Sequence, residues 1–326
     1  MNKKAVLLIG CIVLVLLLLF VDRRYKKQRL APAGSSGTAP NYNQTTPATP
    51  GQNMQDISYC TYAPLQQNYL TLDIYYPATV GSAAPVVVYY HGGGIRNEKL
   101  SKSVISSESF FQPLLQAGYV VVSANYRPGP VAAFPAMVDD AKCAIRFLKV
   151  NAQKYHLNPG GVGVIGTSTG GYIVNMIGLA DKSAGFDIGD YLDQSSKPQA
   201  VVDFFGPSDY LTWGQSATNG GPCPPGVTGF FGGDCSSSNL KKASPVTYIS
   251  SDDPPFLILH GDKDQAVPIA QSQELNSKLQ GVGVASTFIP VQNAPHGFTS
   301  ISGGAFNPGI NQINQDVVNF FDKYLK

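Results

Sequence analysis

The chain has 326 residues, enough for one large α/β domain with its own core. Its net charge of +2 is unevenly distributed, because seven of the 23 Lys/Arg but only one of the 21 Asp/Glu lie in the first thirty residues. The remainder is therefore mildly acidic, which argues against nucleic acid as a partner.

Residues 5–21 form an uncharged apolar run of about 17 residues, which would span roughly 25 Å as a helix. The run fits either a membrane anchor or the core of a signal peptide. Basic residues follow it directly, and the only Ala-x-Ala, formed by Ala31 and Ala33, lies beyond them. This order favours an anchor over a cleaved signal, so residues 1–30 are predicted to be an N-terminal membrane anchor or signal segment.

The next stretch, up to about Gln55, has almost no large apolar side chain and no charge. Such a sequence cannot bury enough apolar surface to order itself. We therefore expect a disordered tether over residues 31–56 and a folded domain over residues 57–326.

Short apolar or β-rich runs then alternate with helix-like segments. The expected strands are 68–77, 85–91, 119–126, 161–166, 200–206, 255–261 and 286–291. The expected helices are 104–117, 134–155, 169–180, 269–280 and 311–325. Several strands are apolar on both faces, which predicts an α/β fold with a mostly parallel central sheet and helices on both faces. Residues 207–254, rich in Gly, Pro and Ser, are an insertion that can form a small lid over a site at the strand ends.

Four cysteines lie outside the apolar run: Cys60, Cys143, Cys223 and Cys235. Cys223 and Cys235 share one Gly/Pro-rich loop, so a short local disulfide is one interpretation and four ordinary thiols are the other.

Two signals conflict on the location of the domain. The basic residues after the apolar run favour the cytoplasmic side, whereas the sparsely charged sequence and the even number of cysteines favour the outside. We expect a single-pass, membrane-anchored protein with an extracytoplasmic domain. Secretion after cleavage and a cytoplasmic-facing domain are the alternatives.

The segment His91-Gly92-Gly93-Gly94 ends one expected strand. Glycines suit a loop whose N–H groups must approach a substrate oxygen closely, so Gly93 and Gly94 are expected donors of an oxyanion hole. As a phosphate-binding loop the segment fails, because no Lys-Ser/Thr follows it.

The segment Gly166-Thr167-Ser168-Thr169-Gly170-Gly171 follows an apolar strand and precedes a helical stretch. That context is typical of a nucleophile elbow, in which glycines permit a sharp turn and the Ser168 hydroxyl projects above the sheet. The Thr169 N–H is the third expected oxyanion donor. Taken alone, the Gly-x-Ser-x-Gly pattern is weak evidence for a catalytic serine, because about 0.1 copies of it would occur by chance in a chain of this length. An inert Ser in a Gly-rich turn is the alternative.

The catalytic base follows by elimination, because the chain has only four histidines and an elbow of this kind orders its triad as Ser, acid and His. His91 and His156 precede the Ser, and His260 precedes the candidate acid. His296, on a loop after a strand, is therefore the predicted general base.

The acid must lie on a strand-end loop that faces this histidine. The segment HGDKDQAVP offers Asp262 and Asp264 after a strand. Asp264 is the predicted acid, Asp262 reads as a turn-forming residue, and Asp203 after the preceding strand is a third choice.

Six motifs together carry a resemblance to a known family. They are HGGG (91–94), NYR (125–127), GTSTGG (166–171), ASPVTYI (243–249), PPFLILHGDKDQAVP (254–268) and HGF (296–298). Over roughly residues 65–325 the chain resembles the esterase/lipase branch of the α/β-hydrolases, which includes hormone-sensitive-lipase-like and feruloyl-esterase-like carboxylesterases.

The resemblance implies the α/β-hydrolase fold. By matching motif positions, it also implies that Ser168 is the nucleophile, Asp264 the acid and His296 the base. The oxyanion glycines of the family match Gly93 and Gly94. Two features depart from the pattern: Thr169 stands where Ala is common, and no long N-terminal cap is present.

We therefore predict a serine carboxylic ester hydrolase that works through an acyl-enzyme on short-to-medium acyl or aryl esters, without metal or organic cofactor. A peptidase or amidase of the same fold and a non-catalytic binding member are the alternatives. Arg127 and Asp140 read as structural partners or surface charges, and Trp213 as a packed lid residue or a substrate platform.

Overall fold

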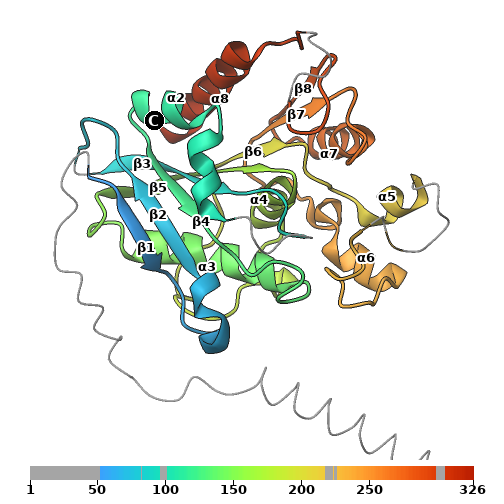
Figure 1. The fold of residues 1–326 in the computed structure, drawn as a ribbon, viewed down its shortest axis with the longest axis horizontal. Helices are drawn as coiled ribbons and strands as arrows, with labels where there is room; N and C mark the ends of the chain where they lie inside the picture. The colour runs from blue at the N-terminus through green and yellow to red at the C-terminus, as the bar shows by residue number, and fades with distance from the viewer. Residues whose placement is uncertain (1–51, 82, 96–100, 217–222, 224–225, 299–304) are drawn as a thin grey trace, which may run out of the picture. The chain divides into compact units, whose positions relative to one another are not determined.

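The computed structural model describes residues 52–81, 83–95, 101–216, 223, 226–298 and 305–326 (Figure 1). The apolar segment predicted at 5–21 and most of the predicted tether lie outside these ranges. Within the described ranges, no helix is both long enough and apolar enough to cross a bilayer.

The described strands form one eight-stranded sheet in the order β1-β2-β4-β3-β5-β6-β7-β8. The strands are β1 (Met54–Ser58), β2 (Thr71–Tyr75), β3 (Ala84–Tyr90), β4 (Val120–Ala124), β5 (Leu157–Thr167), β6 (Ala200–Phe204), β7 (Phe256–Gly261) and β8 (Ser286–Val291). β2 runs antiparallel to β1 and β4, and every other neighbouring pair is parallel. The prediction of a mostly parallel sheet is confirmed.

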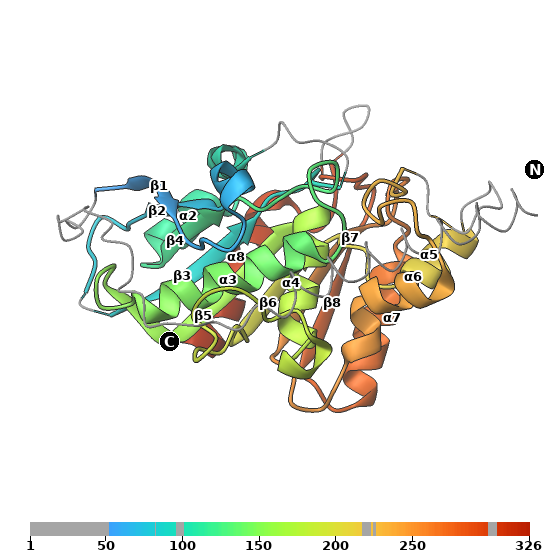
Figure 2. The same cartoon turned by 90° about the horizontal axis from the view of Figure 1, so that it is seen from below.

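Helices lie on both faces of this sheet. The α-helices are α2 (Phe111–Gln116), α3 (Ala136–Val150), α4 (Thr169–Leu179), α5 (Tyr210–Ser216), α6 (Ser237–Ala243), α7 (Ala270–Gly281) and α8 (Ile310–Leu325). The 3-10 helices are η1 (Pro64–Tyr69), η2 (Lys102–Ser107), η3 (Lys182–Ala184) and η4 (Pro245–Tyr248). α3, α4 and α7 cover one face, and α2 and α8 cover the other (Figures 1 and 2).

The alternating side chains of the central strands supply two separate hydrophobic cores. In β3, Val86 and Val88 join the core under α3 and α4, whereas Val87 and Tyr89 join the core under α2 and α8. All four side chains are fully buried, which explains why the strand is apolar on both faces.

Several element bounds differ from the sequence prediction: the helix predicted over 134–155 is α3 over 136–150, and the strand predicted over 161–166 is β5 over 157–167. Two other differences change which elements the chain forms. β1 begins at Met54, so the sheet includes the last residues of the predicted tether. The sequence did not predict this strand because it is identified by its pairing with β2, which local composition does not reveal. The helix predicted over 104–117 is instead η2 followed by α2, with extended backbone at Glu108. Pro113 explains the break, because a proline is tolerated only in the first turn of a helix.

The insertion at 207–254 contributes α5, α6 and η4 to the described structure. Trp213 on α5 is only 7% exposed and packs against Tyr210, with ring centroids 5.7 Å apart. The structure thus supports the interpretation of Trp213 as a packed residue of the insertion rather than as a substrate platform.

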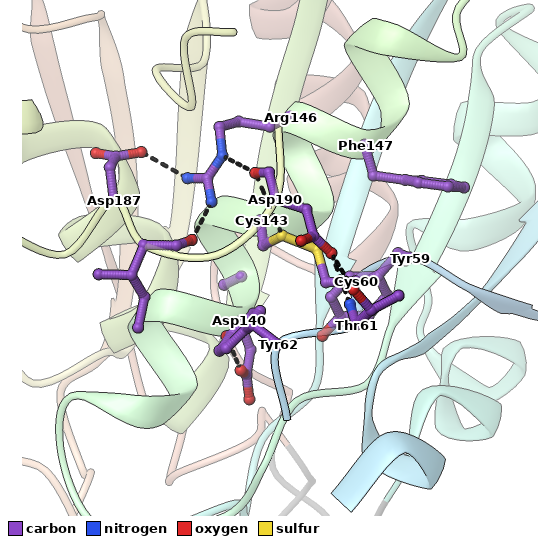
Figure 3. The surroundings of a disulfide bond; sticks show 12 residues. Tyr59, Cys60, Thr61, Tyr62, Asp140, Cys143, Arg146, Phe147, Asp187 and Asp190 are labelled. Atoms are coloured by element: carbon purple, nitrogen blue, oxygen red, sulfur yellow. Dashed lines mark hydrogen bonds and ion pairs between the residues drawn. A yellow bond between two sulfur atoms is a disulfide. The ribbon is translucent and has the colours of Figure 1, made fainter. Parts of the chain in front are cut away.

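Two cysteine pairs are bonded in the structure. Cys223 pairs with Cys235 within the insertion, as the local spacing suggested. Cys60 pairs with Cys143 on α3, with Cα atoms 6.5 Å apart and a sequence separation of 83 (Figure 3). Sequence reasoning missed this second pair because nothing local connects the two positions.

Hydrogen bonds surround the Cys60–Cys143 bond (Figure 3). The Thr61 N–H and hydroxyl donate to the Asp190 carboxylate at 2.7 and 2.9 Å. The fully buried Arg146 donates to the Asp190 carbonyl at 3.0 Å and forms an ion pair with Asp187 at 2.6 Å. These contacts attach the segment after β1 to α3 and to the loop that follows η3.

Candidate active site

Three side chains from three strand ends meet at the carboxyl edge of the parallel sheet. Ser168 lies between β5 and α4, Asp264 follows β7, and His296 follows β8. His296 Nε2 lies 2.9 Å from Ser168 Oγ, and His296 Nδ1 lies 2.7 Å from Asp264 Oδ2. The structure thus brings the predicted nucleophile, base and acid into one hydrogen-bonded chain.

Ser168 occupies a strained turn that the glycines around it make possible. Its backbone has φ 56° and ψ −111°, outside the regions that non-glycine residues favour. A side chain at Gly166 would collide with the Gly170 carbonyl, and one at Gly170 would collide with the Tyr90 carbonyl. The Ser168 N–H donates to Phe204 O at 2.9 Å, which fixes the turn to the end of β6. Main-chain packing therefore sets the position of the nucleophile.

The glycine loop after β3 lies directly against this turn. A Cβ added to Gly92 would sit 3.4 Å from Ser168 Cβ, and Gly93 has the positive φ, 81°, that favours glycine. The Tyr126 hydroxyl donates to His91 O at 2.7 Å, and its ring stacks on the His91 ring at 4.5 Å. Tyr126 thereby holds the start of the loop.

His91, which directly precedes the glycines of this loop, is itself buried. Burial lowers the pKa of its imidazole to about 4, against an ordinary value of 6.5. The ring is thus neutral at pH 7 and adds no charge near the predicted oxyanion donors.

The Asp264 carboxylate has no exposed surface and receives hydrogen bonds at both oxygens. Oδ1 accepts from the main-chain N–H groups of Ala266 and Val267 at 2.8 and 2.9 Å. Oδ2 faces His296 and also His260, whose Nε2 lies 3.1 Å away. Burial alone raises the pKa of Asp264, but the hydrogen bonds from His260 and His296 outweigh it and hold the pKa well below its ordinary value. The carboxylate is therefore charged at pH 7.

The other two candidate acids lie elsewhere. Asp262 is exposed and accepts the Asn293 N–H at 2.7 Å, a contact between the loops after β7 and β8 rather than a bond within a local turn. Asp203 is fully buried on β6, where it accepts from Asn175 Nδ2 and Gly206 N at 2.8 and 2.9 Å.

Arg127 and Asp140 are structural partners. The guanidinium of Arg127 lies 2.7 Å from the carboxylate of Asp140, which is fully buried. The same carboxylate accepts the hydroxyl of Tyr62, so the pair joins α3 to the residues after β1 and β4.

Sequence reasoning missed two residues, one that contacts His296 and one that contacts the glycine loop after β3. The Phe205 ring meets the His296 ring edge to face, with centroids 4.7 Å apart, and its backbone has a positive φ of 46°. Tyr126 stood within the NYR motif, yet only the fold shows its contact with His91. No local signal marked Phe205.

Among the described residues, one group of possible metal ligands lies close together: Cys60, Cys143 and Asp190. The two sulfurs of this group are bonded to each other, so they offer no thiolate for a metal. The serine-histidine-aspartate chain can instead perform proton transfer, because an imidazole held by a carboxylate can take the proton of a serine hydroxyl.

The chain matches a known protein family and several curated esterases in sequence. The BD-FAE family model matches residues 72–279. Esterase LipQ of Mycobacterium tuberculosis is 28% identical over 224 residues, which is 67% of this chain and 51% of LipQ. Esterase LipC of the same organism is 24% identical over 238 residues, 71% of this chain and 57% of LipC. The chain thus spans little more than half the length of these curated relatives.

Solved structures share the fold. A truncated carbohydrate esterase from gut microbiota superposes with a TM-score of 0.70 at 29% identity, over 85% of this chain and 98% of that one. Esterase 2 of Thermogutta terrifontis with bound butyrate superposes with a TM-score of 0.61 at 21% identity, over 77% and 88%. The predicted α/β-hydrolase fold is confirmed.

Proposed function

The chain belongs to the BD-FAE family of α/β-hydrolase esterases, and from that premise we propose that it is a serine carboxylic ester hydrolase. The observation that carries the proposal is the continuous hydrogen-bonded chain from Ser168 Oγ through His296 to Asp264. A serine that is merely part of a Gly-rich turn needs no such partner.

In the proposed reaction, Ser168 Oγ attacks the ester carbonyl carbon while His296 Nε2 takes its proton. The imidazolium then returns that proton to the departing alcohol, and an acyl-enzyme remains. Water repeats the sequence and releases the acid. Asp264 keeps the proton of His296 on Nδ1 and stabilises the imidazolium, a role supported by its charged, fully buried carboxylate.

The tetrahedral intermediate carries a negative oxygen that needs N–H donors. We assign these donors to Gly93, Gly94 and Thr169. The contact of the glycine loop with the nucleophile turn supports the first two, and the position of Thr169 as the first residue of α4 supports the third.

For the substrate we propose short-to-medium acyl or aryl esters. The similar structure from gut microbiota is described as a carbohydrate esterase, so acetylated and aryl-acylated sugars belong in the first substrate panel. A peptidase or amidase would use the same three side chains and is the competing activity.

The experiment compares p-nitrophenyl acetate, butyrate and long-chain esters with aminoacyl anilides, and adds a fluorophosphonate probe that labels only an activated serine. We expect labelling that Ser168→Ala abolishes, and ester turnover well above anilide turnover. Dominant anilide turnover would make the protein an amidase, and absence of labelling would make it a non-catalytic member of the fold.

We also propose that residues 5–21 anchor the chain in a membrane and that the domain faces an oxidising, extracytoplasmic compartment. The two bonded cysteine pairs and the sparsely charged sequence support this side. The basic residues after the apolar run oppose it.

Thiol alkylation of native membranes, before and after reduction, tests the location. We expect the four bonded cysteines, Cys60, Cys143, Cys223 and Cys235, to react only after reduction, and added protease to digest the domain in intact cells. Free thiols, with protease resistance that cell lysis abolishes, would place the domain in the cytoplasm.

A further inference from the structure

His260 is a second histidine in contact with the Asp264 carboxylate, and the proposed reaction gives it no role. It lies near the end of β7, and its side chain is fully buried. Its Nε2 lies 3.1 Å from Asp264 Oδ2, the same oxygen that receives His296 Nδ1. The acid thus stands between two imidazoles.

The neighbours of His260 define which of its nitrogens carries a proton. Nε2 faces two acceptors, Asp264 Oδ2 and the Val267 carbonyl oxygen at 2.9 Å, so it must be the donor. Nδ1 lies 2.7 Å from the hydroxyl of Ser272, a fully buried residue on α7. In the neutral ring Nδ1 accepts that hydroxyl proton, and every polar atom of the group is then satisfied.

The same short turn holds the other oxygen of the acid. Val267 donates its N–H to Asp264 Oδ1 and accepts from His260 through its carbonyl, so one residue contacts both the carboxylate and the imidazole that orients it. The carboxylate is therefore fixed in rotation at both oxygens. Rotation matters because only one oxygen can meet His296 Nδ1 at 2.7 Å.

We propose that His260 is a positioning residue for the acid: together with Ser272 it aims Asp264 Oδ2 at His296, and a chain of polar contacts runs from Ser272 to Ser168. This inference rests on the proposed function, because it assigns His260 a part in the reaction of that site. In a purely structural role, His260 would only connect β7 to α7 through its contact with Ser272, and its loss would not change the hydrogen bond of His296 to Asp264.

The test compares two substitutions of His260 in the full-length protein. His260→Leu removes the donor, whereas His260→Gln keeps an N–H that can reach the carboxylate. We expect His260→Leu to lower kcat about 10-fold or more with KM nearly unchanged, since partners of catalytic side chains typically act at this scale. His260→Gln should recover most of the loss.

A matched pair of serine variants controls for lost stability. Ser272→Ala removes the hydroxyl that meets His260, and Ser208→Ala removes an equally buried hydroxyl that donates to the Gln271 carbonyl on α7 at 2.7 Å. We expect a several-fold fall in kcat only for Ser272→Ala. Should His260→Leu fail to fold, this pair and His260→Gln still decide the question.

Proton NMR supplies a readout that does not need turnover. The His296 Nδ1 proton, shared with Asp264, should give a low-field signal in the wild type that moves upfield and broadens in His260→Leu and Ser272→Ala but not in Ser208→Ala. An unchanged signal together with unchanged kcat in folded variants overturns the proposal. A wild type that turns over neither esters nor anilides refutes the proposed function, while the NMR comparison still decides the role of His260.

Discussion

Packed main chain fixes the nucleophile of the candidate site, whereas hydrogen bonds made by their own side chains fix its acid and base. Ser168 sits on a turn between β5 and α4 that admits only glycine at Gly166 and Gly170. Asp264 and His296 lie on loops after β7 and β8, where a Cβ added to Gly297 would meet nothing within 4 Å. The turn at Ser168 is crowded backbone, whereas the position after His296 has open space beside a hydrogen-bonded network.

This difference indicates how each side tolerates change. A larger side chain in the crowded turn at Ser168 should lower the stability of the fold, because β3 and α4 are packed against the turn and cannot move away from it. Around Asp264 and His296, loss of a hydrogen-bond donor or acceptor should lower activity while the backbone stays intact.

Ser168→Ala removes the nucleophile without touching the packed turn, so kcat should fall roughly 10⁴-fold or more with an unchanged melting temperature. His296→Ala should cost a similar factor. Steady-state kinetics with p-nitrophenyl esters and thermal unfolding measure both effects. Either variant keeping a tenth of wild-type kcat would refute the assignment of these residues.

Asp264→Asn should lower kcat roughly 10³- to 10⁴-fold, because the amide no longer holds the His296 proton on Nδ1. Asp262→Asn is the matched control on the same loop, and it should change kcat less than about 3-fold. The same kinetic assay applies. The reverse order would transfer the acid role to Asp262.

Gly170→Ala should destabilise the fold by about 3 kcal/mol, since its Cβ would collide with the Tyr90 carbonyl. The Gly297 position has open space around it and a positive φ of 83°. Gly297→Ala should therefore destabilise the fold by only about 1 kcal/mol, the cost of placing alanine in a left-handed backbone conformation. Urea unfolding compares the two. Equal losses would show that crowding does not distinguish the two sides.

Asp203→Asn should change how stability depends on pH. Burial raises the pKa of Asp203 to about 6, although hydrogen bonds from Asn175 and Gly206 oppose the rise. The folded carboxyl thus binds its proton more tightly than the unfolded one, whose ordinary pKa is 3.8. Its contribution to stability is present below about pH 4 and is lost as the pH rises through 6.

Relative to the wild type, the Asp203→Asn variant should therefore gain about 2 kcal/mol in unfolding free energy between pH 4 and pH 7. Urea unfolding at several pH values measures the difference between the two proteins. A difference independent of pH would mean that Asp203 ionises alike in the folded and unfolded chain.

The sequence by itself identified most of the sheet and the candidate site. Apolar or β-rich runs marked seven of the eight strands in the described residues, and the strands buried on both faces stand out because they need continuous apolar side chains. Local turn chemistry singled out Ser168, and the order of the motifs left His296 and Asp264 as its partners. These features depend on residues that are near in sequence or on a fixed order along the chain.

Only the tertiary structure decided what joins distant segments. β1 became visible through its pairing with β2, and the Cys60–Cys143 bond joins positions 83 residues apart. The contact of Tyr126 with the glycine loop and the meeting of His260 with Asp264 and Ser272 also depend on how strands and helices pack. No local pattern encodes such distances, because they result from the packing of the whole domain.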